Sequence, residues 1–209
     1  FYGKKIKSPK VKEDKKRAKL FKKYIYKKKI LDFGCGFGNF ANETCKHSKK
    51  TYAFERSKIC KKHIKKKFKK IELLNDLSHF NNFFNTIFLI QTLHYLPQQI
   101  RQLSNLRKKL KKNGKIIIEV PSSNDILLSK FNSQEFKNFT FCIESLIWHN
   151  NISLKKFLKK AGFKNIKIVP FQRYDLNNHM GWLMYGKPGG HEFLRSFCAD
   201  QQKKIYENF

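Results

Sequence analysis

The stretch that decides the fold is Ile30-Leu31-Asp32-Phe33-Gly34-Cys35-Gly36-Phe37-Gly38-Asn39. A short apolar run carries an acidic residue and then turns through three glycines, each separated from the next by one residue. Because glycine has no side chain, such a loop lets the backbone approach a ligand closely at the carboxyl end of a first strand. A dinucleotide-binding loop would need its third glycine at position 39, which is Asn, and no Gly-Lys-Ser/Thr of a P-loop follows. A cationic sulfonium joined to an amino-acid group suits a loop beside Asp32 better than a pyrophosphate does.

Apolar runs of strand length recur along the chain. They are Ile30–Phe33, Thr51–Phe54, Ile71–Leu74, Thr86–Ile90, Ile116–Val120 and Ile166–Val169. Helix-length segments separate them, such as Gln98–Lys112, which Asn113-Gly114 should end, and Ser153–Ala161, which stops at Gly162. Uniformly apolar strands alternating with helices predict an α/β fold, a Rossmann-like and mostly parallel sheet with helices on both faces.

The 209 residues predict a single domain over 1–209, with no internal repeat or flexible linker. Residues 1–28 are rich in Lys and predict a helix that leads into the domain. Residues 122–152 interrupt the strand–helix rhythm, and we expect them to form a lid or a substrate-facing insertion. A turn after Gly186 should lead into an amphipathic helix that runs to the end.

The composition limits the function classes. There are 46 basic residues against 15 acidic ones, a net charge of +31, but only six of the 46 are Arg. Two explanations stay open: the amino-acid bias of an AT-rich coding sequence, or selection for an anionic partner. No run of 18 apolar residues predicts a membrane span, and the Lys-rich start is not a signal peptide. Five cysteines without a C-x-x-C pair predict neither a disulfide framework nor a metal site, which favours a cytoplasmic protein. Because the first residue is Phe1 and not Met, we expect a trimmed version of a longer chain.

Acidic residues follow the next two apolar runs. Glu55 ends the second run, 17 residues after Gly38, and a carboxylate at that position can accept both hydroxyls of a ribose. Asn75-Asp76 follows the third run and could meet the exocyclic amine of an adenine, although Asp76 could equally cap a turn before Leu77-Ser78. The fourth run leads into Gln91-Thr92-Leu93-His94, at the edge where a reactive group would lie.

Together these motifs resemble those of class I S-adenosylmethionine-dependent methyltransferases, from Ile30 to about Val169. The matching residues are D-F-G-C-G-F-G at Asp32–Gly38, the acid at Glu55, N-D at Asn75-Asp76 and a fourth motif at Gln91–Leu96. L-K-K-N-G-K at Leu110–Lys115 resembles the family's L-K-P-G-G turn, with Asn113 and Lys115 as departures.

The resemblance implies a strand order of 3-2-1-4-5-7-6 and S-adenosylmethionine as cofactor, with S-adenosylhomocysteine as product. It implies that Asp32, Gly34, Gly36 and Gly38 hold the methionine part, that Glu55 holds the ribose, and that Asn75, Asp76 and Gln91 complete the cofactor site. Cys35 is interpreted as a small residue that the loop tolerates rather than as a nucleophile. For the family's seventh strand only Gly181–Tyr185 is available, so that strand is either missing or beyond Phe209.

His94 is the candidate catalytic base, because it directly follows the fourth strand; the alternative is a residue at the start of a helix that is bonded to a backbone carbonyl. Candidates for the second substrate are His149, Arg173, Tyr174, His179 and His191. Arg173 can pair with phosphate or carboxylate and Tyr174 can stack on a sugar or base, whereas the alternative is a folded turn with core aromatics. His149 has a packing role as its alternative. The segment from Phe171 to His191 resembles one in bacterial methyltransferases of surface-polysaccharide and modified-sugar pathways.

Three functions compete. The first is a methyltransferase that acts on an oxygen or nitrogen of a small anionic, sugar- or phosphate-containing acceptor in capsule-type polysaccharide biosynthesis. The second is an RNA methyltransferase, which the charge favours, but which the scarcity of Arg and the absence of an N-P-P-Y or D-P-P-Y signature disfavour. The third is a binding protein that keeps the cofactor fold without catalysis.

Overall fold

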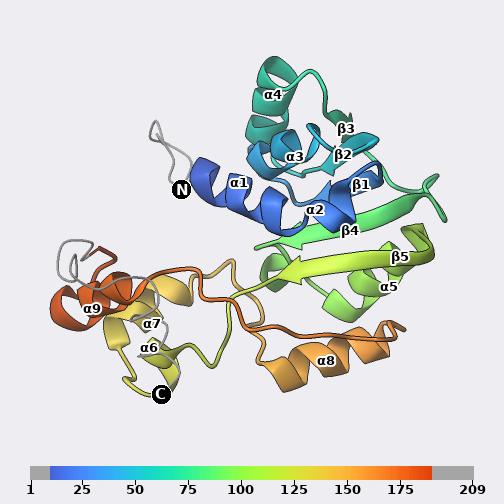
Figure 1. Cartoon of the computed structure of the whole chain (residues 1–209). Helices are drawn as coiled ribbons and strands as arrows, with labels where there is room; N and C mark the ends of the chain where they lie inside the picture. The colour runs from blue at the N-terminus through green and yellow to red at the C-terminus, as the bar shows by residue number, and fades with distance from the viewer. Residues whose placement is uncertain (1–9, 190–209) are drawn as a thin grey trace. The chain divides into compact units, whose positions relative to one another are not determined.

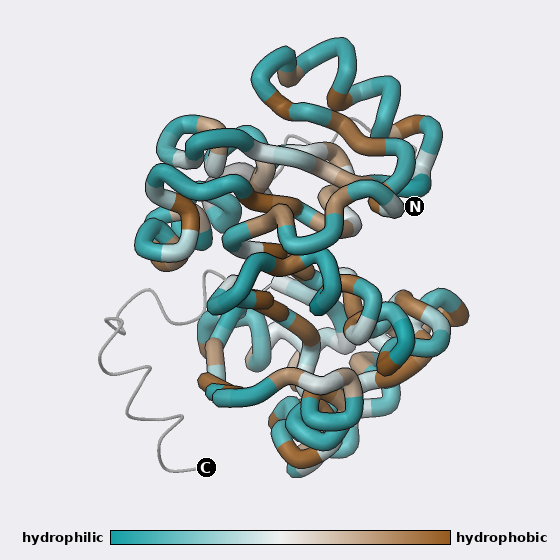
Figure 2. Tube along the Cα trace, turned by 90° about the vertical axis from the view of Figure 1, so that its right-hand side faces the viewer, coloured by the Kyte–Doolittle hydropathy of each residue, from teal (hydrophilic) through white to brown (hydrophobic). Residues whose placement is uncertain are grey.

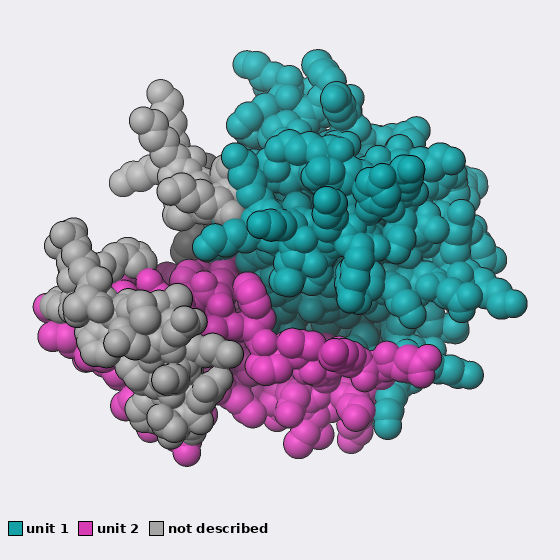
Figure 3. Space-filling view, in the orientation of Figure 1, with its two compact units in different colours: residues 1–120, 157–164 teal, residues 121–156, 165–209 magenta. Residues whose placement is uncertain are grey.

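The computed structural model describes residues 10–189 of the 209-residue chain. Its internal contacts divide the chain into two compact units (Figure 3). The first comprises residues 1–120 and 157–164, and the second comprises residues 121–156 and 165–209. The whole segment that the sequence marks as an insertion, residues 122–152, therefore belongs to the second unit, together with the chain after position 164.

A five-stranded parallel sheet forms the centre of the first unit. Its strands are β1 (Lys29–Phe33), β2 (Lys50–Phe54), β3 (Glu72–Leu74), β4 (Phe84–Ile90) and β5 (Leu110–Glu119). They lie in the order β3-β2-β1-β4-β5, and every pair of neighbours is parallel (Figure 1). This order confirms the predicted Rossmann-like fold and the first five positions, 3-2-1-4-5, of the predicted strand order. All carboxyl ends consequently meet at one edge of the sheet and all amino ends at the other.

Helices cover the sheet on both faces. They are α1 (Lys10–Leu20), α2 (Lys22–Ile25), α3 (Asn39–Thr44), α4 (Lys58–Lys67), the short 3₁₀ helix η1 (Leu93–Tyr95) and α5 (Gln99–Lys109). On one face, Ala18 of α1 and Phe40 of α3 pack with Ile30 and Phe88 of the sheet. On the other side of the sheet, α5 buries Leu103 and Leu106 (Figure 1). Figure 2 shows the apolar residues as short stretches between long hydrophilic ones, as expected for buried strands and half-exposed helices.

Two helix boundaries differ from the prediction. The N-terminal helix is interrupted at Phe21, after which α2 buries Ile25 completely. The helix expected over 98–112 ends at Lys109, because Leu110 pairs with Phe84 and begins β5. Asn113, expected to end that helix, lies instead inside a bulge of β5 and has a φ of 67°.

The second unit contains small helices. They are α6 (Ile126–Ser129), α7 (Gln134–Thr140) and α9 (Leu176–Tyr185), with α8 (Asn151–Lys160) shared between the two units. The predicted helix over 153–161 coincides with α8 within two residues at its start. Trp182 of α9 is buried, and its ring centroid lies 5.1 Å from that of Phe136 and 4.9 Å from that of Phe139.

Neither strand expected after β5 forms in the described part of the chain. Residues 166–169 have no strand structure, and Val169 is 64% exposed. Gly181–Tyr185 belongs to α9, whose first turn is capped by the Asp175 side chain and which ends at Gly186 in a left-handed conformation. Asp175 and Gly186 favour the start and the end of a helix, and this preference decides against the strand that the apolar residues suggested. The terminal helix expected after Gly190 lies outside the described residues.

Candidate functional site

The glycine loop forms the centre of the site, at the carboxyl end of β1. Gly34, Gly36 and Gly38 all have positive φ values, from 54° to 77°. A Cβ atom at Gly34 would lie 2.3 Å from Cγ2 of Thr92, so a larger residue cannot be placed there. At Gly36, in contrast, no atom lies within 4 Å of that position. The loop therefore packs against the protein at Gly34 and is open at Gly36, where a ligand can approach the backbone.

Glu55 holds this loop from the end of β2. Its Oε2 accepts a hydrogen bond from the backbone N–H of Gly36 at 2.8 Å, and its Oε1 accepts from the N–H groups of Arg56 and Ser57 at 2.7 and 2.9 Å. Each carboxylate oxygen has two lone pairs, so the carboxylate can still accept bonds from a ligand. The structure thus brings Glu55 and the loop together; its role toward a ribose stays a prediction.

Asp32 lies inside the protein beneath the loop. Its residue is 2% exposed, and its Oδ2 is buried without a hydrogen-bond partner among the described residues. Burial, together with the nearby charges of Asp14 and Glu55, raises the pKa of the Asp32 carboxyl to about 8, although a hydrogen bond with the backbone of Ala41 opposes the shift. The carboxyl group is therefore largely protonated at neutral pH, and a cation placed beside it would favour its ionised form.

A cluster of one arginine and three acidic residues, which the sequence did not point to, lies at the carboxyl edge of the sheet. Arg17 of α1 is 5% exposed and donates from Nε and Nη2 to the two carboxylate oxygens of Glu119, at 2.8 and 2.6 Å. It also donates to Asp14 at 3.0 Å and to Glu13 at 3.3 Å. Burial would lower the pKa of Arg17, but the hydrogen bonds and charge of Glu119, with Asp14 and Glu13, raise it above its ordinary value. The only signals in the sequence were an acid at the end of the fifth apolar run and one of six arginines among many lysines.

Gln91 joins this cluster. Its Nε2 donates to Oε1 of Glu119 at 3.1 Å, and its backbone N–H donates to the carbonyl of Glu119 at 2.8 Å. Gln91 also has a φ of 53°, a left-handed conformation that is uncommon outside glycine. The backbone therefore turns sharply at the end of β4, and Gln91 is fixed at the carboxyl edge; its role toward a cofactor stays a prediction.

Asn75 and Asp76 are exposed after β3. Oδ2 of Asp76 accepts hydrogen bonds from the side chain and the backbone N–H of Ser78, and these bonds lower the pKa of Asp76. Nζ of Lys61 donates to Oδ1 of Asn75 at 3.4 Å. In this structure Asp76 caps a local turn, as its alternative interpretation had it, and its contact with an adenine stays a prediction.

His94 lies in η1, directly after β4, and is 3% exposed. Its ring centroid is 3.9 Å from that of Tyr95. The neighbouring Thr92 connects this turn to the glycine loop, because its hydroxyl donates to the carbonyl of Gly34 at 3.2 Å. His94 thus belongs to the same sheet edge as Asp32 and Glu55, although it is buried; its catalytic role stays a prediction.

The residues proposed for a second substrate belong to the second unit. His149 is 2% exposed, its Nδ1 lies 3.2 Å from Oγ of Ser153, and burial lowers its pKa. His179 is also buried, with Nδ1 3.2 Å from the carbonyl oxygen of Asp175. Both geometries match a packing role better than a surface contact.

Arg173 and Tyr174 are accessible. Tyr174 is 46% exposed, and the guanidinium carbon of Arg173 lies 5.0 Å from the centroid of its ring. His191 lies outside the described residues. In the second unit, Arg173 and Tyr174 are therefore the predicted substrate residues whose side chains an acceptor could reach.

Neither a metal site nor a nucleophilic cysteine accounts for the site. Within residues 10–189, no group of three or more His, Cys, Asp or Glu side chains could hold a metal ion. Burial strongly raises the pKa of the Cys35 thiol, as do the neighbouring Asp32 and Glu55, so Cys35 lacks thiolate character. In the same part of the chain, no helix is long and apolar enough to cross a membrane.

Comparison with known proteins agrees with this geometry. A family profile described as "Methyltransferase domain" matches residues 9–168. The chain is 31% identical over 149 residues to the uncharacterized protein MJ0638 of Methanocaldococcus jannaschii. That match covers 69% of this chain and spans only 60% of the length of that relative.

Solved structures share the fold. A SAM-dependent methyltransferase from Archaeoglobus fulgidus has a TM-score of 0.65 at 19% identity, covering 95% of this chain and 85% of the other. The YcgJ protein of Bacillus subtilis has a TM-score of 0.62 at 12% identity, with 94% and 82% covered. A SAM-dependent methyltransferase from Aquifex aeolicus has a TM-score of 0.58 at 17% identity, with 79% and 93% covered. At such low identity these likenesses establish the fold.

Proposed function

The chain belongs to the methyltransferase-domain family, and from that premise we propose that it transfers a methyl group from S-adenosylmethionine to a small anionic acceptor. The family and fold are those predicted from the glycine loop. The identity of the acceptor and the roles of individual residues are the proposed part.

One observation carries the cofactor assignment: the buried, unpartnered Oδ2 of Asp32 beneath a loop that is open at Gly36. A buried carboxyl oxygen without a hydrogen-bond partner costs free energy, and a cationic ligand would offset that cost. The amino-acid part of S-adenosylmethionine carries an ammonium group, and its sulfonium supplies the activated methyl. The residues present therefore fit this cofactor, with Asp32 and the loop beside the methionine part and Glu55 beside the ribose.

The protein's own contribution to the reaction would be mainly alignment. Holding two reactants in line can supply about 7–11 kcal/mol of the barrier. A neutral hydroxyl acceptor also needs a group that removes its proton, and we assign this to His94, because it follows β4 directly at the carboxyl edge and its neutral imidazole can accept a proton. An acceptor oxygen that is already ionised would need no base.

For the acceptor we propose an oxygen, or a nitrogen, of a sugar- or phosphate-containing molecule of capsule-type polysaccharide biosynthesis. The net charge of +31 and the pair formed by the half-buried Arg173 and the exposed Tyr174 support an anionic molecule with a stackable ring. The pathway itself rests on the resemblance of the segment from Phe171 to His191. Release of S-adenosylhomocysteine should be measured with sugar phosphates and nucleotide sugars, and in parallel with RNA fragments. Turnover of RNA alone would favour the second function, and no turnover of any acceptor would favour the non-catalytic one.

Calorimetric titration with S-adenosylhomocysteine tests the cofactor assignment. Glu55→Ala should weaken binding by roughly 1.5–3 kcal/mol, because a charge-assisted hydrogen bond to the ribose is lost. The matched control is Glu43→Ala, which removes an acid of α3 that pairs with Lys46 on the surface. Unchanged affinity in the Glu55 variant, or an equal loss in the control, would contradict the assignment.

A further inference from the structure

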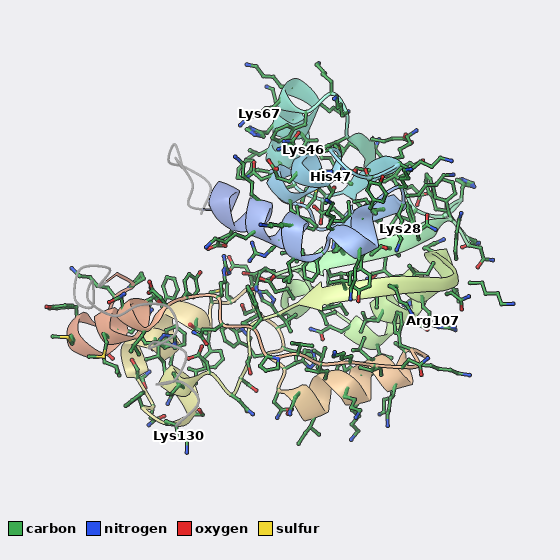
Figure 4. All side chains as sticks on the ribbon, in the orientation of Figure 1. Lys28, Lys46, His47, Lys67, Arg107 and Lys130 are labelled. Atoms are coloured by element: carbon green, nitrogen blue, oxygen red, sulfur yellow. The ribbon has the colours of Figure 1, made fainter. Side chains whose placement is uncertain are left out.

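A depression of about 450 Å³ opens in the first unit at the amino-terminal edge of the sheet, opposite to the edge that carries Asp32 and Glu55. Its lining includes four lysines, Lys23, Lys28, Lys112 and Lys115, together with Tyr24 and Asn85, and no acidic residue. We call it the lysine pocket. Figure 4 shows Lys28 on the side of the sheet where β5 begins.

The four lysines converge without counter-ions. Among residues 10–189, none of them makes an ion pair, whereas the neighbouring Lys46 and Lys50 pair with Glu43 and Glu72. Positive charges that gather in a concave site raise the local potential, and an anionic ligand is what lowers it. The described residues do not supply an anion that balances this charge, so the pocket is suited to bind an anionic ligand.

Two of these ammonium groups are held in place. Nζ of Lys28 donates to the backbone carbonyl of Lys23 at 2.8 Å. The Nζ atoms of Lys23 and Lys28 lie 5.0 and 5.8 Å from the centroid of the Tyr24 ring. These contacts restrict two flexible side chains, so that less conformational entropy is lost when they bind a ligand.

The other two lysines reach the pocket through a bulge. Phe84 of β4 pairs with Leu110 of β5, but the next pair joins Thr86 to Lys115, so that four residues of β5 lie opposite Asn85 alone. The bulge is tight, because a Cβ atom at Gly114 would lie 2.9 Å from the backbone oxygen of Lys111. Bulges redirect side chains and tend to occur at functional places in sheets. Here the bulge places Lys112 and Lys115 on the wall of the pocket.

The positive charge extends beyond the pocket along the same edge. Lys29, the first residue of β1, and Lys49, which precedes β2, lie at this edge in neighbouring segments, whereas Lys50 is already paired with Glu72. The backbone N–H of Lys49 donates to the carbonyl of Lys28 at 2.9 Å, which connects this row to the pocket. Neighbouring strands are about 4.8 Å apart. A continuous row of charges at such spacing suits a ligand with repeated phosphates better than one with a single phosphate.

We propose that the lysine pocket and the adjoining row bind the phosphates of single-stranded nucleic acid without reading its sequence. Lysine supplies point charges for phosphates, and the partly exposed Tyr24 offers a ring on which a base can stack. The pocket lies at the edge opposite to the cofactor residues, so it is a docking surface rather than the place of methyl transfer. This inference goes beyond the proposed small-molecule acceptor and does not depend on it.

The test uses the whole chain and a fluorescently labelled oligouridylate of about 12 nucleotides, with anisotropy measured over a series of NaCl concentrations. The pocket variant is Lys28→Gln with Lys112→Gln, and the matched control is Lys65→Gln with Lys66→Gln, two exposed lysines of α4. Each phosphate contact contributes about 0.7 to the slope of log affinity against log salt for a single strand. We expect the pocket variant to bind about tenfold more weakly and to lower that slope by about 1.4, and the control to change less than about threefold.

Three results would overturn the proposal. The first is that the parent chain does not bind in about 50 mM salt, where phosphate contacts are strongest. The second is that the pocket variant and the control lose the same affinity. The third is that uridine monophosphate competes as effectively as the oligomer. The last result would define a site for a single phosphate. The second pocket variant, Lys23→Gln with Lys115→Gln, should reproduce the loss if either lysine of the first variant proves necessary for folding. Affinity for S-adenosylhomocysteine, measured on the same samples, separates failure of this inference from failure of the proposed function.

Discussion

The two edges of the five-stranded sheet differ in charge and in burial. At the carboxyl edge, Asp32 is 2% exposed and the side chain of Glu119 is 12% exposed. At the amino edge, Lys23, Lys112 and Lys115 are exposed. A parallel sheet produces this separation, because residues that follow strands collect on one edge and residues that precede strands collect on the other. A net charge of +31 therefore describes neither edge, and the acidic residues Asp32, Glu55 and Glu119 lie at the edge where the cofactor is proposed to bind.

The difference also separates two kinds of energetic cost. An exposed lysine remains hydrated, and its charge costs the fold little. A buried carboxyl loses its hydration and must be paired, protonated or bound to a ligand. Substitutions at the carboxyl edge should consequently affect activity and stability strongly, whereas matched substitutions at the amino edge should not.

The largest expected effect concerns His94. With a neutral hydroxyl acceptor, His94→Gln should lower turnover by about 10²–10⁴-fold, the usual contribution of a positioned base, while affinity for the cofactor stays nearly the same. The measurement is the initial rate of S-adenosylhomocysteine release. An acceptor that is already ionised should show a much smaller loss.

His47, an exposed histidine in the turn before β2, provides the matched control at the opposite edge. His47→Gln should leave turnover within about twofold, because it lies far from the proposed transfer. Turnover of the His94 variant within a few-fold of the parent on a hydroxyl acceptor would show that the base is misassigned. His179 and His191 would then be tested next.

The next effect concerns the stability of the carboxyl edge. Arg17→Met should lower the free energy of unfolding by roughly 3–5 kcal/mol, because it removes the cation that pairs with the largely buried Glu119 carboxylate. Chemical denaturation measures this change. Lys46→Met, which breaks the surface pair with Glu43, should cost less than about 1 kcal/mol.

A double variant sharpens this prediction. Arg17→Met with Glu119→Leu removes the Glu119 carboxylate together with its partner and should recover part of the lost stability, while Asp14 and Glu13 still lose their bonds to Arg17. If the double variant is as unstable as the sum of its single changes, the ion pair is not the cause of the loss. Loss of packing around α1 would then be the better explanation.

The sequence was sufficient to predict the glycine loop and the five strands because both depend on local patterns. Asp32–Gly38 can be read within seven residues, and each strand is a continuous apolar run between polar segments. The acids Glu55 and Asp32 also could be placed at one edge, since parallel strands bring their carboxyl ends together. These features need no knowledge of long-range packing.

Contacts between distant residues could not be predicted in this way. Arg17 and Glu119 are separated by 102 positions, and nothing in either neighbourhood indicates the other. The bulge at Asn113 depends on how β5 pairs with β4, and the pattern of the segment was equally consistent with a helix end. Gly181–Tyr185 resembled a strand because its residues are apolar, whereas Asp175 and Gly186 define a helix. In each case tertiary context decided between two local interpretations.

The smallest expected effect, at most about 1.4 kcal/mol per pH unit, is a dependence of stability on pH that comes from Asp32. Its pKa is about 8 in the folded protein and near 3.8 when the carboxyl group is exposed. Between these values the folded protein binds more protons than the unfolded chain, so the free energy of unfolding of the empty protein should fall as the pH rises from about 4 to about 8. Denaturation at several pH values measures this trend, and Asp32→Asn should reduce it.

Binding of S-adenosylhomocysteine should show the opposite trend with pH. Its ammonium group favours the ionised form of Asp32, so binding releases a proton below a pH of about 8, and affinity rises with pH by at most about tenfold per unit. Calorimetry in two buffers of different ionisation enthalpy detects that proton. Asp32→Asn should abolish the release, whereas Lys115→Gln at the amino edge should leave it unchanged. If the parent chain releases no proton, the ammonium group does not lie beside Asp32, and the buried carboxyl has a structural role at an edge whose chemistry depends on Glu55 and the glycine loop.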